Sequence, residues 1–346
     1  MKIKNVLLSS VACLLAVSSA KAADAVKAEP ETAEGVRVCE AFGSGYFYLP
    51  GSETCFKIGG YLRFEGDYGK NQYGTAGNLR SWDAFARAQV DLNAKTDTEL
   101  GDLSSLISLR ADGRNSTSRS VFLNQGYLSL SGFKVGYFRG WWDDDIVGET
   151  DTLANDETRL VSASYTYNAG LFGAGISLDG LGRYGNKDIG VGGKLSAAFG
   201  PVKANVIAGY DGGTKKAAVR GIVSSEVGPG TLEVAAVFAN GMNYYYGVSR
   251  ASLAVGYQLH VTDKFKITPG FQYFWGLGKY SAYADSAGAP VKVSLNTWRS
   301  GLAFDYEIIK NLDALLSVQF QPKFIESTGK VAKNQVTGFI RLQRTF

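Results

Sequence analysis

The chain ends in the stretch Val336-Thr337-Gly338-Phe339-Ile340-Arg341-Leu342-Gln343-Arg344-Thr345-Phe346. Successive side chains of a β-strand point to opposite sides. One side of this stretch carries Val336, Gly338, Ile340, Leu342 and Phe346 and is apolar apart from Arg344 near its end. The other side is polar except for Phe339. A strand with one apolar face, one polar face and an aromatic last residue is typical of the closing strand of a transmembrane β-barrel.

The same alternation recurs along the chain. In residues 56–65 most even positions are apolar, while the odd positions include Lys57, Arg63 and Glu65. Residues 84–93 and 299–306 repeat the pattern. The count is about sixteen, an even number, as single-chain bacterial barrels require. The expected strands lie near residues 55–67, 81–96, 100–112, 119–130, 133–140, 158–168, 171–179, 187–199, 202–211, 215–227, 231–239, 249–261, 264–275, 291–306, 311–321 and 334–346.

Turn signals separate the expected strands. Short connections such as Gly200-Pro201 and Lys310-Asn311 largely alternate with longer polar loops, such as those near 68–80 and 276–290. This alternation places the short turns and both termini on the periplasmic side. A secreted β-sandwich is the alternative, but no linker or change of composition divides residues 55–346. We therefore predict an all-β fold, a single transmembrane antiparallel β-barrel over residues 55–346.

The first residues have the pattern of an export signal. Lys2 and Lys4 precede an apolar run over residues 6–17, and Ala20-Lys21-Ala22 fits a cleavage site. The apolar run is too short for a membrane anchor. We expect residues 1–22 to be removed as a signal peptide and residues 23–54 to form a periplasmic lead-in to the first strand.

Charge and rare residue types argue against several classes of function. The chain has 36 basic and 32 acidic residues, and loss of the three lysines in residues 1–22 leaves a net charge of +1, which gives no argument for nucleic-acid binding. Cys39 and Cys55 remain, and a disulfide is the default pairing in an oxidising compartment. A metal site would need further ligands, and the only histidine, His260, lacks the partners of a catalytic triad. We expect no cofactor, no metal and no enzymatic activity.

Both ends of the mature chain carry a family resemblance. Residues 36–64, which include both cysteines and Gly59-Gly60-Tyr61-Leu62-Arg63-Phe64, resemble the amino-terminal signature of alphaproteobacterial outer-membrane porins. Residues 338–346 resemble the last strand of these proteins. The resemblance implies a sixteen-stranded barrel in outer-membrane lipid, a homotrimer, and passive diffusion of small hydrophilic solutes and ions. It also implies a third external loop that folds into the lumen.

The third external loop in this count, residues 141–157, is acidic and contains no basic residue. A run of this kind is commonly only a solvated loop. Its position and length favour a constriction folded into the lumen. The expected acidic residues of this constriction are Asp143, Asp144, Asp145, Glu149, Asp151, Asp156 and Glu157.

A basic wall is expected to face this loop. Arg63, Arg87, Arg110 and Arg341 lie on the lumen-facing sides of the first, second, third and last expected strands, which are neighbours in a closed barrel. We expect the first three at similar depth and Arg341 lower. Each can also pair with a nearby acid such as Glu65. Opposite charges across a narrow lumen create a transverse field, and the acidic loop predicts a weak preference for cations.

Two other functions stay open. One is a barrel that selects a particular sugar or ion, for which aromatic side chains along the pore would be a sign. The other is a non-conducting surface adhesin with a plugged bore. The aromatic clusters Trp141-Trp142 and Tyr244-Tyr245-Tyr246 either mark membrane boundaries or pack within loops.

Overall fold

The computed structural model describes residues 37–69, 82–114, 120–155, 157–182, 188–278, 294–325 and 330–346. Residues Val38–Phe346 form one compact unit. The expected signal peptide, residues 1–22, and residues 23–36 of the expected lead-in lie outside the described residues. Among the residues that are described, no helix is both long and apolar enough to cross a membrane.

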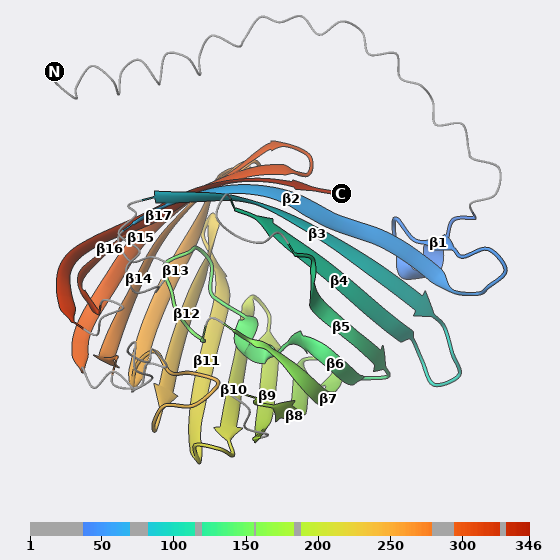
Figure 1. Cartoon of the computed structure of the whole chain (residues 1–346), viewed down its shortest axis with the longest axis horizontal. Coiled ribbons are helices and arrows are strands. Elements are labelled where there is room, and N and C mark those ends of the chain that lie inside the picture. Colours follow the sequence, from blue (N-terminus) through green and yellow to red (C-terminus); the bar gives the residue numbers. More distant parts are fainter. Residues whose placement is uncertain are drawn as a thin grey trace, which may run out of the picture. The chain divides into compact units, whose positions relative to one another are not determined.

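Strands make up most of the described chain (Figure 1). Near the start lie a short 3-10 helix, η2 (Glu40–Phe42), and a two-residue strand, β1 (Phe47–Tyr48). A second 3-10 helix, η3 (Trp141–Asp143), lies between two of the long strands. Within the described residues the long strands number sixteen, and they are β2 (Cys55–Gly69), β3 (Trp82–Thr96), β4 (Leu103–Gly113), β5 (Phe122–Leu130), β6 (Phe133–Arg139), β7 (Arg159–Ala169), β8 (Phe172–Gly180), β9 (Ile189–Phe199), β10 (Val202–Asp211), β11 (Lys216–Val227), β12 (Gly230–Ala239), β13 (Ala251–Thr262), β14 (Phe265–Leu277), β15 (Leu295–Ile309), β16 (Leu312–Ile325) and β17 (Val331–Thr345).

The long strands close into a ring. Each strand from β2 to β17 pairs antiparallel with the next one along the chain, and β17 then pairs with β2. The pairing continues to the last residue, because the backbone N–H of Phe346 donates to the Gly60 carbonyl at 3.1 Å and the Gly60 N–H donates to the Phe346 carbonyl at 3.2 Å. A closed sheet leaves no edge open to other chains. The predicted antiparallel barrel is confirmed, and each expected strand corresponds to one observed strand.

The two faces of the barrel have the reverse polarity of a soluble protein. Large apolar side chains such as Leu62 and Ile340, each 58% exposed, cover the outer face. Polar side chains such as Arg220 and Gln272, each 0% exposed, are enclosed within the ring. In water such an apolar surface would be unstable, whereas lipid hydrocarbon accepts it because every backbone group of a closed barrel is paired within the sheet. The polarity therefore favours a membrane barrel over a β-sandwich with a dry core.

The connections differ at the two ends of the barrel. The hairpin between β5 and β6 turns through Ser131 and Gly132, with φ of 47° and 89°, and the hairpin between β15 and β16 uses Asn311 with φ of 65°. Positive φ suits tight turns whose twist matches that of the flanking strands. The start of β2 and the end of β17 lie at this short-turn end, since Cys55 pairs with Lys95 close to the turn that leads into β4.

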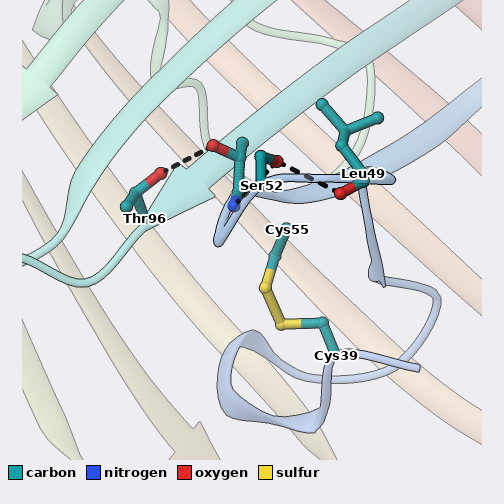
Figure 2. The surroundings of a disulfide bond; sticks show 6 residues. Cys39, Leu49, Ser52, Cys55 and Thr96 are labelled. Carbon is teal, nitrogen blue, oxygen red and sulfur yellow. Dashed lines mark hydrogen bonds between the residues drawn. A yellow bond between two sulfur atoms is a disulfide. The ribbon is translucent and has the colours of Figure 1, made fainter. Parts of the chain in front are cut away.

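A disulfide ties the segment before the barrel to the first strand. Cys39 is bonded to Cys55, the first residue of β2, with a Cα–Cα distance of 5.9 Å (Figure 2). The same view shows the Ser52 hydroxyl, which donates to the Leu49 carbonyl at 3.2 Å and tightens the turn before β2. The predicted disulfide is confirmed.

Lumen-facing lysines support the segment that the disulfide closes. Lys95 of β3 lies 5.5 Å from the ring centroid of Phe42 and 5.7 Å from that of Tyr46. Lys57 of β2 donates to the Ser44 carbonyl at 3.2 Å. Cation–aromatic contacts of this kind contribute about 0.5–1 kcal/mol or more where water is excluded. The segment is therefore packed against the inner wall at the short-turn end.

Candidate pore constriction

The connection between β6 and β7, residues 140–158, lies within the ring of strands (green in Figure 1). We call it the lumen loop. It begins with η3, in which Trp142 is buried, and it contacts inward-facing side chains of β9, β11, β12 and β14–β17. Its attachments are thus spread over one side of the inner wall.

Arg220 of β11 is the central attachment. Its guanidinium donates to the carbonyls of Trp141 at 2.9 Å, Trp142 at 3.1 Å and Leu153 at 3.4 Å. The guanidinium also lies 5.3 Å from the Trp142 ring centroid. Five fixed donors on one planar group suit a cluster of carbonyls. One side chain therefore joins the two ends of the lumen loop to the wall.

Other wall side chains form hydrogen bonds with backbone groups in the middle of the loop. Gln272 of β14 accepts from the Thr152 N–H at 2.7 Å and donates to the Thr152 carbonyl at 3.0 Å. Glu233 of β12 accepts from the Val147 N–H at 2.7 Å. These bonds satisfy loop backbone groups that would otherwise be enclosed without partners.

Glycines allow the loop to approach the wall closely. A Cβ on Gly270 of β14 or Gly301 of β15 would collide with the Thr150 side chain. A Cβ on Gly256 of β13 would collide with the Val147 carbonyl. These strands therefore have no side chain where the Thr150 side chain and the Val147 carbonyl occupy the space.

The predicted acidic residues of the loop take different places. At the base, Asp143 pairs with Arg139 at 2.6 Å and Glu157 pairs with Arg159 at 2.7 Å. The short distances and adjacent positions show that these two acids neutralise arginines at the ends of β6 and β7. They are anchors of the base rather than free charges.

Two neighbouring acids face the lumen. The Asp144 side chain is 54% exposed and lies 3.7 Å from Lys194 of β9. Asp145 is also exposed. Asp156 was predicted as part of the same acidic set and lies outside the described residues.

The surroundings of the loop raise the pKa of two carboxyl groups. The pKa of Asp145 rises to about 6, chiefly because the enclosing protein reduces its hydration, and Arg220 opposes that shift. Asp145 thus contacts lumen water, but the surrounding protein leaves its carboxylate less hydrated than it would be in bulk water. The pKa of Asp151 rises to about 7 through burial, with a further contribution from the charge of Asp145. One Asp151 carboxyl oxygen is buried without a hydrogen-bond partner among the described residues.

Two of the predicted wall arginines are paired with wall side chains. Arg63 of β2 donates to the Gln343 side-chain oxygen at 2.7 and 2.9 Å and lies 3.8 Å from Glu65. Arg87 of β3 makes a two-point bond with Asp112 of β4 at 2.6 and 2.8 Å. The expected pairing with nearby acids thus occurs for both.

Arg110 of β4 donates to the Tyr61 hydroxyl at 3.1 Å. Strand register places Arg63 directly opposite Arg87, whereas Arg110 is opposite Gln89, two residues nearer the short-turn end. Arg63 and Arg87 are therefore directly opposite each other on β2 and β3, and Arg110 on β4 is one lumen-facing position nearer the short-turn end.

Arg341 of β17 connects the wall to the lumen loop. It pairs with Glu65 of β2, and its guanidinium lies 3.6 Å from the Glu149 carboxylate. Register places Arg341 opposite Glu65, which is nearer the long-loop end than Arg63. The expectation that Arg341 is lower than Arg63 is therefore wrong along this strand pair. The structure brings Arg341 and Glu149 into contact, while the described partners of the other three arginines are wall residues.

Of the wall residues that hold the loop, sequence reasoning identified Arg341 but not Arg220 or Gln272. Arg220 and Gln272 face inward by the same alternation that revealed Arg63, so their orientation was readable. Their contact with the loop was not readable, because it depends on which strands the loop crosses after the ring has closed.

The aromatic clusters pack within loops. Tyr245 and Tyr246 are 4% and 0% exposed, and the Trp142 and Tyr245 ring centroids are 5.8 Å apart. Asn155 of the lumen loop accepts from the Gly247 N–H at 2.8 Å. Residues 240–250, between β12 and β13, therefore fold into the lumen against the lumen loop, and a membrane-boundary position for these aromatic residues is wrong.

No group of three or more His, Cys, Asp or Glu side chains within the described ranges is arranged to hold a metal ion. The arrangement consists of paired charges, amides and hydroxyls around a partly filled bore.

Comparisons with known proteins agree with the barrel and its polar bore. The family model described as the porin subfamily matches residues 24–339. The chain is 42% identical to the putative outer membrane protein y4fJ of Sinorhizobium fredii, over 100% of this chain and 99% of that protein. It is 30% identical to porin Omp2b of Brucella canis, over 100% of both chains.

Among solved structures, the outer membrane channel DcaP of Acinetobacter baumannii superimposes with a TM-score of 0.67. The match covers 86% of this chain and 99% of that one at 14% identity, and so supports the fold alone. The family match and the full-length relatives go further: this chain belongs to the porin subfamily and is a porin of the bacterial outer membrane.

Proposed function

We propose that the barrel is a water-filled channel for passive diffusion of small hydrophilic solutes and ions, and that the lumen loop forms its narrowest part. The observation that carries the proposal is a loop fastened inside a ring whose interior is polar, through Arg220, Gln272 and Arg341. A loop that is held against one side of the wall narrows the passage without closing it.

The passage is proposed to lie between the lumen loop and the inner face of β2–β4. The loop is attached to β9, β11, β12 and β14–β17. The wall with Arg63, Arg87 and Arg110 is then left to face the exposed carboxylates Asp144 and Asp145. This arrangement would create the transverse field inferred from the sequence.

Weak cation preference follows from how the charges are paired. Arg63 and Arg341 share Glu65, and Arg87 is paired with Asp112, so much of the positive charge on the wall is compensated locally. Within the part of the chain that the structure describes, the exposed carboxylate of Asp144 forms its ion pair with Lys194, at 3.7 Å. Reversal potentials in a potassium chloride gradient test this inference, and a strong anion preference would contradict it.

The channel proposal is tested by single-channel recording with purified full-length protein in planar bilayers. Stepwise, ohmic conductance is expected. Protein that is folded by circular dichroism and heat modifiability but never conducts would instead favour an adhesin with a plugged bore. Flux of small neutral solutes into liposomes that declines with solute size would support general diffusion.

We also propose a homotrimer without enzymatic activity, as the porin family resemblance implies. Small side chains on the outer face of β3, such as Ala84, Ala86 and Ala88, would let another subunit approach closely. Mass measurement of the detergent-solubilised protein tests the trimer. Export with removal of residues 1–22, leaving residues 23–54 as the periplasmic lead-in, is tested by the mass of the protein isolated from outer membranes.

A further inference from the structure

A cavity within the lumen lies between the base of the lumen loop and the short-turn end of the barrel. It has a volume of about 590 Å³ and is bounded by the inner faces of β4–β9, by η3 and by residues 244–245. Binding sites for small molecules typically have volumes of about 300–1,000 Å³ and combine apolar walls with a few polar groups. The cavity is therefore large enough to hold a solute, and its lining indicates which kind.

A row of hydroxyl groups crosses the wall of this cavity. Strand register places Ser104 opposite Ser129, Ser129 opposite Lys134, Lys134 opposite Ser164, and Ser164 opposite Ser177. All five residues line the cavity. Neighbouring strands are about 4.8 Å apart, so β4–β8 present one polar group per strand at that spacing. Each hydroxyl can both donate and accept a hydrogen bond.

Lys134 is the cation in the middle of this row. Its Nζ lies 3.9 Å from the ring centroid of Tyr127 and 4.2 Å from that of Phe138. Among the described residues no carboxylate forms an ion pair with it. The rings stabilise the ammonium by cation–π attraction, which leaves its N–H groups available to an acceptor.

The other side of the cavity supplies rings and an acceptor. Trp141 and Tyr244 are partly buried and line it. Asp179 of β8, 6% exposed, accepts from the Tyr245 hydroxyl at 2.8 Å and from the Ser177 hydroxyl at 3.0 Å. The carboxylate is therefore held in place in the cavity wall with acceptor capacity remaining.

We propose that this cavity is a binding site for a neutral sugar, a monosaccharide or short oligosaccharide. A sugar presents alternating donors and acceptors, which match the hydroxyl row, Lys134 and Asp179. Its C–H faces match the rings of Trp141 and Tyr244. The charged groups of the lining have both signs, Lys134 and Arg139 against Asp102, Glu157 and Asp179, so the lining does not favour an anionic solute. The inference rests on the proposed channel function, because the sugar reaches the cavity through the lumen.

The test is ion current through single channels of the full-length protein while maltose or glucose is added. A sugar that only thickens the solution lowers the current in proportion to its concentration. A sugar that occupies a site in the lumen lowers the current along a saturating curve and adds current noise. We expect saturation for these neutral sugars and weaker binding of glucuronate.

Matched variants locate the site. The double variant Ser129→Ala with Ser164→Ala, and the variant Lys134→Met, are each expected to raise the half-saturating sugar concentration by about three- to tenfold, as loss of one or two hydrogen bonds predicts. The controls are Ser196→Ala on β9 and Lys266→Met on β14, which remove a hydroxyl and an ammonium from wall positions outside the cavity. They should leave sugar binding unchanged.

The outcomes are distinguishable. Conducting channels whose current falls only linearly with sugar would overturn this inference and leave the channel function standing. Saturation that neither cavity variant shifts would also overturn it, as would tighter binding of glucuronate than of glucose. A folded protein that never conducts would refute the channel function and this inference with it.

Discussion

Replacement of Arg220 by methionine should loosen the lumen loop and leave the barrel intact. Methionine keeps a long unbranched stem and removes the charge and all donors. Arg220 makes two hydrogen bonds of ordinary length to the loop, 2.9 Å to Trp141 and 3.1 Å to Trp142, and a longer one of 3.4 Å to Leu153. A hydrogen bond with a charged partner contributes about 1.5–3 kcal/mol.

The two shorter bonds alone therefore contribute about 3–6 kcal/mol to attachment of the loop. The energetic cost of burying the guanidinium offsets part of this sum. With about 3 kcal/mol lost, the ratio of attached to detached loop falls by roughly 100-fold. The remaining bonds from Gln272 and Glu233 hold the centre of the loop, so the base near Trp141 and Trp142 should detach first.

Single-channel recording and hydrogen exchange provide the assay. Arg220→Met should show frequent brief changes of conductance and faster amide exchange in residues 140–158, while heat modifiability of the barrel stays near that of the unchanged protein. Arg220→Lys, which keeps the charge, should lie between the two. Arg87→Met is the matched control, because its described partners, Asp112 and Tyr61, are wall residues and not part of the loop. Equal current noise and equal exchange in Arg220→Met and the unchanged protein would refute the reasoning.

The structure makes four further predictions. The pKa values of Asp145 and Asp151, about 6 and about 7, are raised from 3.8, so the protonated acids favour the folded loop at low pH; this contribution declines as pH rises above 3.8 and is gone above about 7. Amide exchange itself accelerates with pH, so the comparison uses protection factors, which for the loop should be higher at pH 5 than at pH 8, and Asp151→Asn should reduce the difference. Cation preference should weaken as pH falls from 8 to 5, because protonation removes the charge of Asp145. The reversal potential measures this change, and Asp145→Asn should reduce it. A reversal potential that stays the same from pH 8 to pH 5 would contradict the prediction. Gly301→Val should displace the loop and change the conductance without unfolding the barrel, because the added side chain collides with Thr150 of the loop. A variant with the conductance of the unchanged protein would show that the loop does not lie against Gly301. Reduction of the disulfide, whose cysteines are 16 residues apart, should destabilise the amino-terminal segment by about 3 kcal/mol yet preserve conductance, and protease access to residues 39–48 measures the release.

The strands were predictable because their signal is local. Alternation from Val336 to Phe346 shows which face meets lipid whether or not the partner strand is known. The lumen-facing side of Arg63 and Arg87 follows from the same rule. Pairing of Cys39 with Cys55 needed only two cysteines in an oxidising compartment.

The site was predictable only in part. The acidic composition of residues 141–157 singled out the loop, but not the division between acids paired at its base and acids exposed to the lumen. The aromatic run at Tyr244–Tyr246 has the same composition whether it meets the membrane boundary or fills the bore. Packing against Trp142 decided between them, and that contact joins segments about a hundred residues apart.

From the sequence alone come the number of strands, the face that each presents to lipid and the closure at Phe346, because a period of two requires only the geometry of an extended backbone. Tertiary structure decided where the lumen loop is fastened and which charges remain unpaired. Those outcomes depend on Arg220, Gln272 and Arg341 meeting the loop across the bore, and such distances exist only once β17 has paired with β2.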